Sequence, residues 1–157
     1  MSVPVVGQSY RGVEGRSGYL LRQAWRALEG AMEIALRQYG LSPPQYGVLT
    51  VLAREPGASG ADLARAVHTT PQAMNGVLAT LEREALVERR PHPTHGRILQ
   101  ATLTSEGRRR LEAANPSIRA LERATEQGWS SDDLATVKSW LVTTAQRLER
   151  ITDPRAA

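Results

Sequence analysis

The pattern of apolar and polar positions predicts two helices in the first third of the chain. Apolar residues recur at steps of three and four over residues 21–39, which predicts a helix that ends at Gly40. Ser42, Pro43 and Gln45 then form a capping box with proline at the first helical position, so a second helix begins at once. Residues 1–15 show no such period, contain several glycines and predict a flexible arm.

The middle of the chain predicts two helices joined by a tight turn. Ser59 and Asp62 form a capping box before the first helix. Thr70 followed by Pro71 begins the second helix, which covers residues 70–84. Because only a few residues separate the two, this layout is typical of a helix-turn-helix.

Two short segments with the alternation of β-strands follow, at residues 86–90 and 97–103. The segment between them is rich in proline and glycine and predicts a loop. A two-stranded ribbon after a helix-turn-helix makes a winged helix. The predicted fold class is therefore mainly α, a winged helix-turn-helix with about six helices and a two-stranded β wing over residues 86–103.

Two long helices are predicted after the wing. Thr104 caps the first, and Pro116 should kink it or split it in two. Ser130 begins the last helix, whose apolar stripe extends over residues 134–151. This stripe and the one over residues 21–39 exceed what a small winged domain can cover. They favour a homodimer over a monomer in which the two stripes cover each other.

Length and composition narrow the function classes. The chain has 157 residues, enough for one domain, and no cysteine, which excludes disulfides, thiolate metal ligands and thiol chemistry. The formal net charge is +4, and residues 57–110 hold eight arginines against five acids. This excess lies on the predicted helix-turn-helix and favours an anionic partner. No secretory signal or membrane-spanning run is visible, so a cytoplasmic location is expected.

Four runs of the sequence carry a resemblance to a known family: residues 60–65 (GADLAR), 70–75 (TPQAMN), 81–90 (LEREALVERR) and 103–107 (LTSEG). In this order they resemble the MarR family of bacterial transcription regulators. The resemblance implies dimerisation helices at residues 16–40 and 104–152, a DNA-binding domain at residues 41–103 and a tail at residues 153–157. It also implies a ligand-responsive homodimer that binds a pseudo-palindromic operator in double-stranded DNA, as a repressor.

Two positions depart from the family pattern. Members usually carry Arg in the middle of the recognition helix, where this chain has Gly76, and Asp two residues before Arg97, where it has His95. The first departure removes a phosphate or base contact, and the second removes the carboxylate that would orient Arg97. A winged-helix module that binds proteins and not DNA is therefore the alternative function.

The recognition helix offers a set of candidate DNA contacts. With its apolar side turned inward, Gln72, Asn75 and Gly76 lie on or beside the exposed side. We predict that Gln72 and Asn75 contact adenine in the major groove, although such residues can also be ordinary solvated side chains. Gly76 either lets the backbone approach the groove closely or merely weakens the helix. Thr70 and Arg65 complete the set, Arg65 as a phosphate contact.

Basic residues flank the tip of the predicted wing. Arg89, Arg90 and Arg97 can enter a narrow minor groove, and His95 can contact phosphate or sugar. The alternative is that these arginines only solvate a sheet edge. The positive excess of this half of the chain favours DNA contact.

The sequence gives little support for a metal site, a cofactor or an enzymatic activity. His68, His92 and His95 lack the spacing of a metal site, and no cofactor is predicted. No phosphate loop, nucleophile elbow or paired carboxylates point to an enzyme.

In relatives, small aromatic effectors bind between the dimerisation helices and the DNA-binding domain. Four aromatic residues could line such a crevice or belong to the core: Tyr19, Trp25, Tyr39 and Tyr46.

Overall fold

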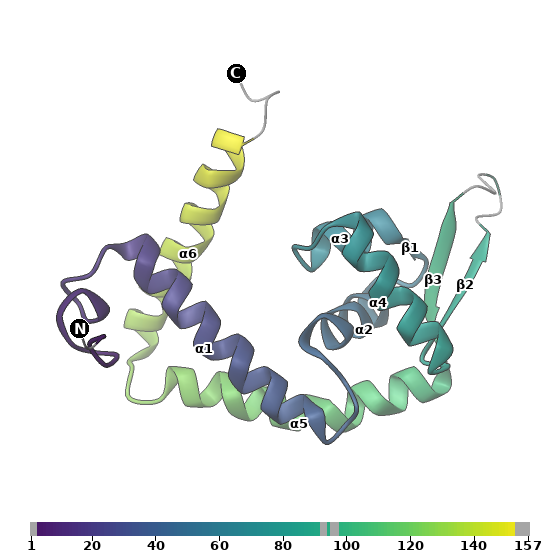
Figure 1. Ribbon diagram of the computed structural model, residues 1–157, viewed down its shortest axis with the longest axis horizontal. Helices are drawn as coiled ribbons and strands as arrows, with labels where there is room; N and C mark the ends of the chain where they lie inside the picture. Colours follow the sequence, from purple (N-terminus) through teal and green to yellow (C-terminus); the bar gives the residue numbers. More distant parts are fainter. Residues whose placement is uncertain (1–2, 92–93, 95–97, 153–157) are drawn as a thin grey trace. The chain divides into compact units, whose positions relative to one another are not determined.

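The computed structural model describes residues 3–91, 94 and 98–152. The chain divides into two compact units, Met1–Arg119 and Ala120–Ala157. Six α-helices and a small antiparallel sheet, in the order of a winged helix-turn-helix, confirm the predicted fold class for the described residues (Figure 1). The elements are η1 (Ser9–Arg11), α1 (Ser17–Arg37), α2 (Pro43–Arg54), β1 (Ala58–Ser59), α3 (Gly60–Ala66), α4 (Pro71–Arg83), β2 (Val87–Pro91), β3 (Leu99–Leu103), α5 (Ser105–Glu126) and α6 (Ser131–Thr152).

The predicted helix starts are confirmed by their caps. The hydroxyl of Ser42 accepts a hydrogen bond from the Gln45 N–H, and the Gln45 side chain accepts one from the Ser42 N–H at 2.8 Å. Ser59 forms the same reciprocal pair with Asp62 at the start of α3. Thr104 accepts the Gly107 N–H at 2.9 Å and begins α5. Each cap satisfies an N–H group that lacks a partner within its own helix.

Two predictions about helix ends have different outcomes. α1 ends at Arg37, and the turn after it closes at the predicted Gly40, which takes a left-handed φ of 64° while the Leu41 N–H donates back to the Leu36 carbonyl. Of the kink or split expected at Pro116, the split is wrong, because α5 is one continuous helix with this proline inside it. Pro116 is exposed, so the carbonyl one turn earlier that loses its N–H donor lies toward solvent.

The sheet has three strands and not the predicted two. Its order is β1-β3-β2, with both pairs antiparallel. β1 adds Ala58 opposite Ala101 and Ser59 opposite Gln100, so it closes the edge of β3 that faces away from β2. Two residues are too short to show an alternating pattern, which is why the sequence did not predict this strand.

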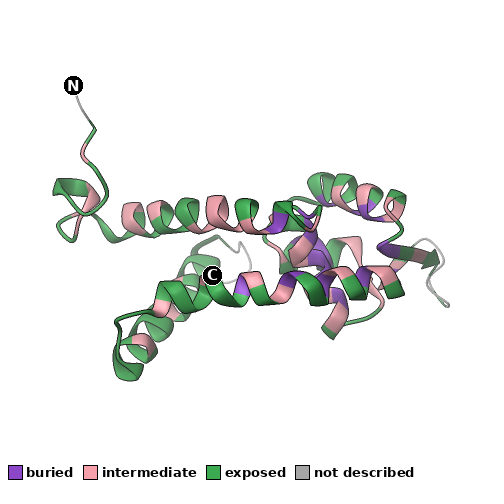
Figure 2. Ribbon diagram, turned by 90° about the horizontal axis from the view of Figure 1, so that it is seen from below, coloured by how far each residue is buried: buried purple, intermediate pink, exposed green. Residues whose placement is uncertain are grey.

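We call residues 43–103 the winged lobe. The main core lies in this lobe and is completed by the adjoining ends of α1 and α5. Figure 2 shows the buried residues concentrated in this part of the molecule. The fully buried large side chains come from nearly every element there: Leu36, Val48, Leu49, Leu52, Leu63, Met74, Leu78, Leu81 and Leu86. This packing fixes the surface side chains of α3, α4 and the strands relative to one another.

The long helices outside the winged lobe have exposed apolar stripes. α6 buries none of its residues, and α1 buries only Leu36. Trp25 on α1 is 56% exposed, and Trp140 on α6 is 43% exposed. No described helix combines the length and the apolar composition needed to cross a membrane.

The predicted flexible arm contains an element that the sequence pattern did not indicate. The 3-10 turn η1 follows Gly7 and Gln8, and Arg11 at its end hydrogen-bonds Gln23 of α1. Such a turn is too short to produce a hydrophobic period.

Candidate nucleic-acid interface

The recognition helix α4 has two distinct faces. Met74, Leu78 and Leu81 are buried on one face. Gln72 and Asn75 are exposed on the other, as the helical period predicts. The structure therefore places both amides where a major groove can reach them, and contact with DNA stays a prediction.

Thr70 and Gly76 have different local roles in α4. The Thr70 hydroxyl accepts the Ala73 N–H at 3.1 Å, so this side chain caps the helix while its own O–H remains able to donate. A Cβ added at Gly76 would meet no atom of this chain within 4 Å. Packing among the described residues therefore does not require glycine there.

Arg65 lies on α3 and remains accessible. Its guanidinium pairs with Asp62, yet 73% of its side chain is exposed. Hydrogen bonds from the Ser59 hydroxyl and backbone N–H, reinforced by Arg65, lower the pKa of Asp62 below its ordinary value. Exposed ion pairs are weak, so Arg65 can exchange this partner for a phosphate.

The Arg89 side chain turns toward the protein, and its contact with DNA stays a prediction. It pairs with Glu82 of α4, and only 22% of the Arg89 side chain is exposed. The hydrogen bond from Arg89 lowers the pKa of Glu82. Arg89 is held by a nearby carboxylate, so it links β2 to the recognition helix and presents little charge to a ligand.

Arg90 points to solvent at the start of the wing tip. Its side chain is 79% exposed and pairs with Glu88 at 2.8 Å. The predicted contacts His95 and Arg97, together with His92, lie outside the described residues.

Ion pairing across the winged lobe and the start of α5 reveals candidates that sequence analysis missed. Each acid of residues 57–110 has an arginine partner: Asp62–Arg65, Glu82–Arg89, Glu84–Arg110, Glu88–Arg90 and Glu106–Arg109. Arg83 and Arg108 are exposed and have no ion pair among the described residues. Their charges are not offset by a neighbouring carboxylate of the described residues, and the sequence could not reveal which arginines are paired.

The four aromatic effector candidates do not gather in one place. Tyr39 bonds Ser117 at 2.8 Å and Tyr46 bonds Asn115 at 2.9 Å, so both hydroxyls contact the middle of α5. Tyr19 lies in the first turn of α1. At about 1.5 Å per helical residue, that is roughly 30 Å from Tyr39. Trp25 is exposed between them.

The described residues contain no cluster of side chains that could bind a metal ion. No group of three or more His, Asp or Glu side chains comes close enough to hold an ion there. His68 is exposed in the turn between α3 and α4, where its φ is 53°.

Comparison with known proteins agrees with this geometry. The family model described as MarR family matches residues 39–98. The HTH-type transcriptional repressor Rv2887 of Mycobacterium tuberculosis is 41% identical over 105 residues, which cover 67% of this chain and 76% of Rv2887. The chain belongs to the MarR family.

Solved structures of MarR-family regulators share the fold. The M. tuberculosis MarR family protein Rv2887 in complex with p-aminosalicylic acid superposes with a TM-score of 0.67 at 33% identity, covering 83% of this chain and 98% of that one. The repressor CouR, from Rhodococcus jostii RHA1, was solved bound to a 23-mer DNA duplex. It superposes with a TM-score of 0.79 at 23% identity, covering 88% of this chain and 98% of CouR, and supports the fold alone.

Proposed function

We propose that this MarR-family chain is a homodimeric, ligand-responsive repressor that binds a pseudo-palindromic operator in double-stranded DNA in the cytoplasm. The observation that carries the proposal is the exposed polar face of α4, with Gln72 and Asn75 on a helix whose other face is locked into the core. Relatives at 41% identity are named repressors. The chain acts by binding, with no catalytic step.

Charge supports DNA as the partner. Arg65, Arg83, Arg90 and Arg108 are exposed around the helix-turn-helix and the wing. Such residues neutralise phosphates and release counterions, which makes affinity fall with salt. Amides on α4 can then supply the base-specific part of recognition.

The exposed stripe of α6 supports a dimer. Val137, Trp140, Leu141 and Leu148 are each at least 40% exposed in the single chain. Burying such a stripe against a second copy removes apolar surface from water. A two-fold dimer also presents two recognition helices to half-sites about 34–36 Å apart.

A small aromatic acid is the proposed effector, because Rv2887 was solved with p-aminosalicylic and salicylic acids. Such a ligand releases DNA only if it binds the non-DNA-binding state more tightly. The ligand must therefore bind with different free energies to two conformations of the dimer, which differ in the distance between their recognition helices.

The central test is titration of the DNA upstream of this gene at several salt concentrations. We expect footprint protection of two half-sites and a salt slope equivalent to several released counterions. Absence of binding at low salt would support the protein-binding alternative and refute the proposal.

Variants separate base readout from charge. Asn75→Ala should weaken operator binding by about 1–3 kcal/mol and leave binding to unrelated DNA nearly unchanged. Arg108→Gln should weaken binding to all sequences and reduce the salt slope by about 1. Gln38→Ala, at the exposed end of α1, is the matched control and should bind as the wild type does. Equal binding by all three variants would contradict the assigned interface.

A further inference from the structure

The N-terminal arm is folded tightly against the first turns of α1. A Cβ added at Gly12 would lie 2.6 Å from the Gly7 carbonyl oxygen, and one added at Gly15 would overlap the Tyr10 carbonyl oxygen. Gly7 itself has a φ of 96°. Gly12 and Gly15 therefore have to be glycine because a Cβ there would push the backbone apart, and Gly7 supplies a left-handed φ that side chains rarely adopt.

The arm places a partly buried cation beside α1 without a counter-charge. Arg11 donates through Nε to the Gln23 side-chain oxygen at 2.8 Å and through Nη1 to the Pro4 carbonyl at 2.9 Å. The Gln23 amide donates back to the Arg11 carbonyl at 3.2 Å. All these acceptors are neutral, and no acid pairs with Arg11 among the described residues. A partly buried guanidinium in this condition favours binding of an anion.

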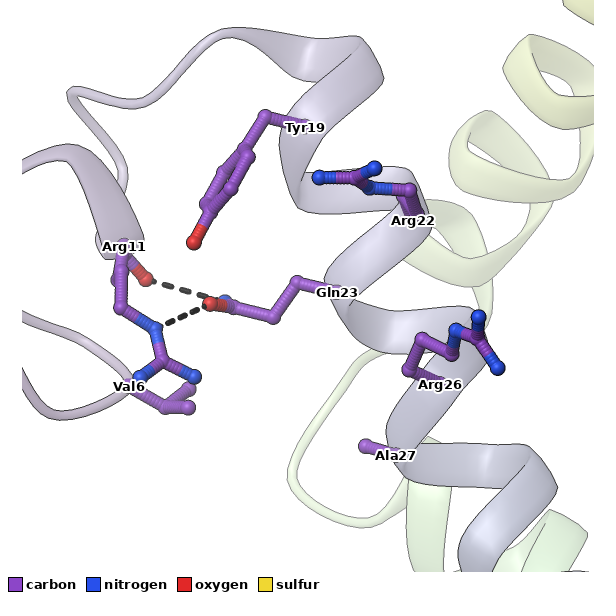
Figure 3. Close-up of a pocket in the computed structure, with 7 residues that line it drawn as sticks. All are labelled: Val6, Arg11, Tyr19, Arg22, Gln23, Arg26 and Ala27. Carbon is purple, nitrogen blue, oxygen red and sulfur yellow. Dashed lines mark hydrogen bonds between the residues drawn. The ribbon is translucent and has the colours of Figure 1, made fainter.

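A hollow of about 480 Å³ lies between the arm and α1, and Figure 3 shows the side chains around it. Arg22 lies on its wall and has no ion-pair or hydrogen-bond partner within the described chain. Arg26 also lines the hollow and pairs with Glu29 at 3.2 Å, at an exposed position. The guanidiniums therefore outnumber the carboxylates around this hollow.

Part of the same wall is apolar. Val6 comes from the arm, and Ala27 comes from α1. The ring of Tyr19 packs edge-on against Tyr10, with ring centres 5.7 Å apart, so Tyr19 is held in place. The hollow thus combines apolar surface with guanidinium groups on its lining, and its volume lies within the range of small-molecule sites, about 300–1,000 Å³.

We propose that this hollow binds the carboxylate of a small amphipathic acid that carries a ring. The carboxylate would lie between the guanidiniums of Arg11 and Arg22, whose planar forks match its two oxygens. The ring would lie along Tyr19 and Ala27. The proposal of a binding site depends only on these contacts and not on the proposed function. Its use as an effector site, which would couple occupancy to DNA release, rests on the proposed function.

The test uses the full-length protein labelled with ¹⁵N and titrated with benzoate, benzamide or inorganic phosphate. Benzoate should shift the Arg11 Nε–H and Gln23 side-chain signals saturably. Benzamide has the same shape without the charge and should produce shifts only at about tenfold or higher concentration. Equal responses to benzoate and benzamide would overturn the proposal. Phosphate binding as tightly as benzoate would also overturn it, because the site would then recognise any anion.

Substitutions locate the binding site. Arg22→Gln should weaken benzoate binding by at least about tenfold. The matched control Arg37→Gln, on the same helix but beyond the hollow, should leave it unchanged. Gly15→Ala should abolish benzoate binding by displacing the arm while every lining side chain remains. Undiminished benzoate binding by Arg22→Gln or by Gly15→Ala would refute the site.

Promoter binding measured on the same samples separates the two proposals. Benzoate binding without DNA binding would refute the proposed function and leave the hollow in place. DNA binding without benzoate binding would do the reverse. Gly15→Ala should still bind promoter DNA, because Gly15 lies outside the winged lobe.

Discussion

Replacing Gly107 with alanine should destabilise the junction between the wing and α5. A Cβ at this position would overlap the Leu86 carbonyl oxygen and lie 2.9 Å from the Leu86 carbonyl carbon. The same oxygen accepts the Thr104 N–H at 3.1 Å, and the Thr104 hydroxyl donates to the Ala85 carbonyl at 2.7 Å. The obstacle is therefore backbone held by hydrogen bonds, which cannot rotate away as a side chain can.

The magnitude follows from what must move. Leu86 is fully buried, so its displacement strains the core by about 1–3 kcal/mol. Lengthening the bond from Thr104 to Leu86 costs about 1 kcal/mol more. Alanine gains about 1 kcal/mol over glycine as a helix former. The net loss is about 2 kcal/mol, which lowers Tm by roughly 4–8 °C for a chain of this size.

Thermal unfolding at fixed protein concentration measures this loss, and Gly76→Ala is the matched control. A Cβ at Gly76 meets nothing within 4 Å, so that variant should gain about 1 kcal/mol and raise Tm by roughly 2–4 °C. The two substitutions are chemically identical and have opposite predicted signs. A Gly107→Ala variant as stable as the wild type would refute the close approach of α5 to Leu86.

Three further predictions concern single side chains. Glu82→Gln should be less stable than the wild type at neutral pH, as shown by urea unfolding. Because Arg89 lowers the folded pKa of Glu82, this stabilisation is complete above the ordinary value of 4.5 and is lost as pH falls through the lowered pKa, so the difference should shrink in acid. Tyr46→Phe removes the 2.9 Å bond to Asn115 and should cost about 1 kcal/mol of unfolding free energy. Leu141→Glu places a charge on the exposed α6 stripe and should convert the dimer to a monomer in light scattering.

Features that depend on neighbouring residues were predictable from the sequence. The caps of α2, α3 and α4 each join residues three positions apart, so the pattern of residue types contains the whole interaction. The same holds for the buried face of α4, whose period reflects which side packs inward. Exposure of Gln72 and Asn75 follows from that period.

Features that depend on distant pairing were not predictable. β1 exists because Ala58 meets Ala101, and no local pattern in two residues indicates such a partner. The arm's turn depends on Gln23 accepting from Arg11 across a helix start. α5 continues through Pro116 because the proline removes only one backbone hydrogen bond, at an exposed position. The general rule for proline inside a helix assumes a larger free-energy cost.

Arg89 illustrates why a basic sequence near a wing does not show which of its arginines are already paired with acids. Ala85 takes a left-handed φ of 54°, and the chain turns back so that β2 packs beside the end of α4. Arg89 then meets Glu82, seven residues earlier in the sequence. This pair neutralises an acid on the recognition helix that would otherwise repel phosphate. Arg89 thus offsets a charge that would oppose a polyanion at this face, while Arg83 and Arg108 are exposed and have no acidic partners among the described residues.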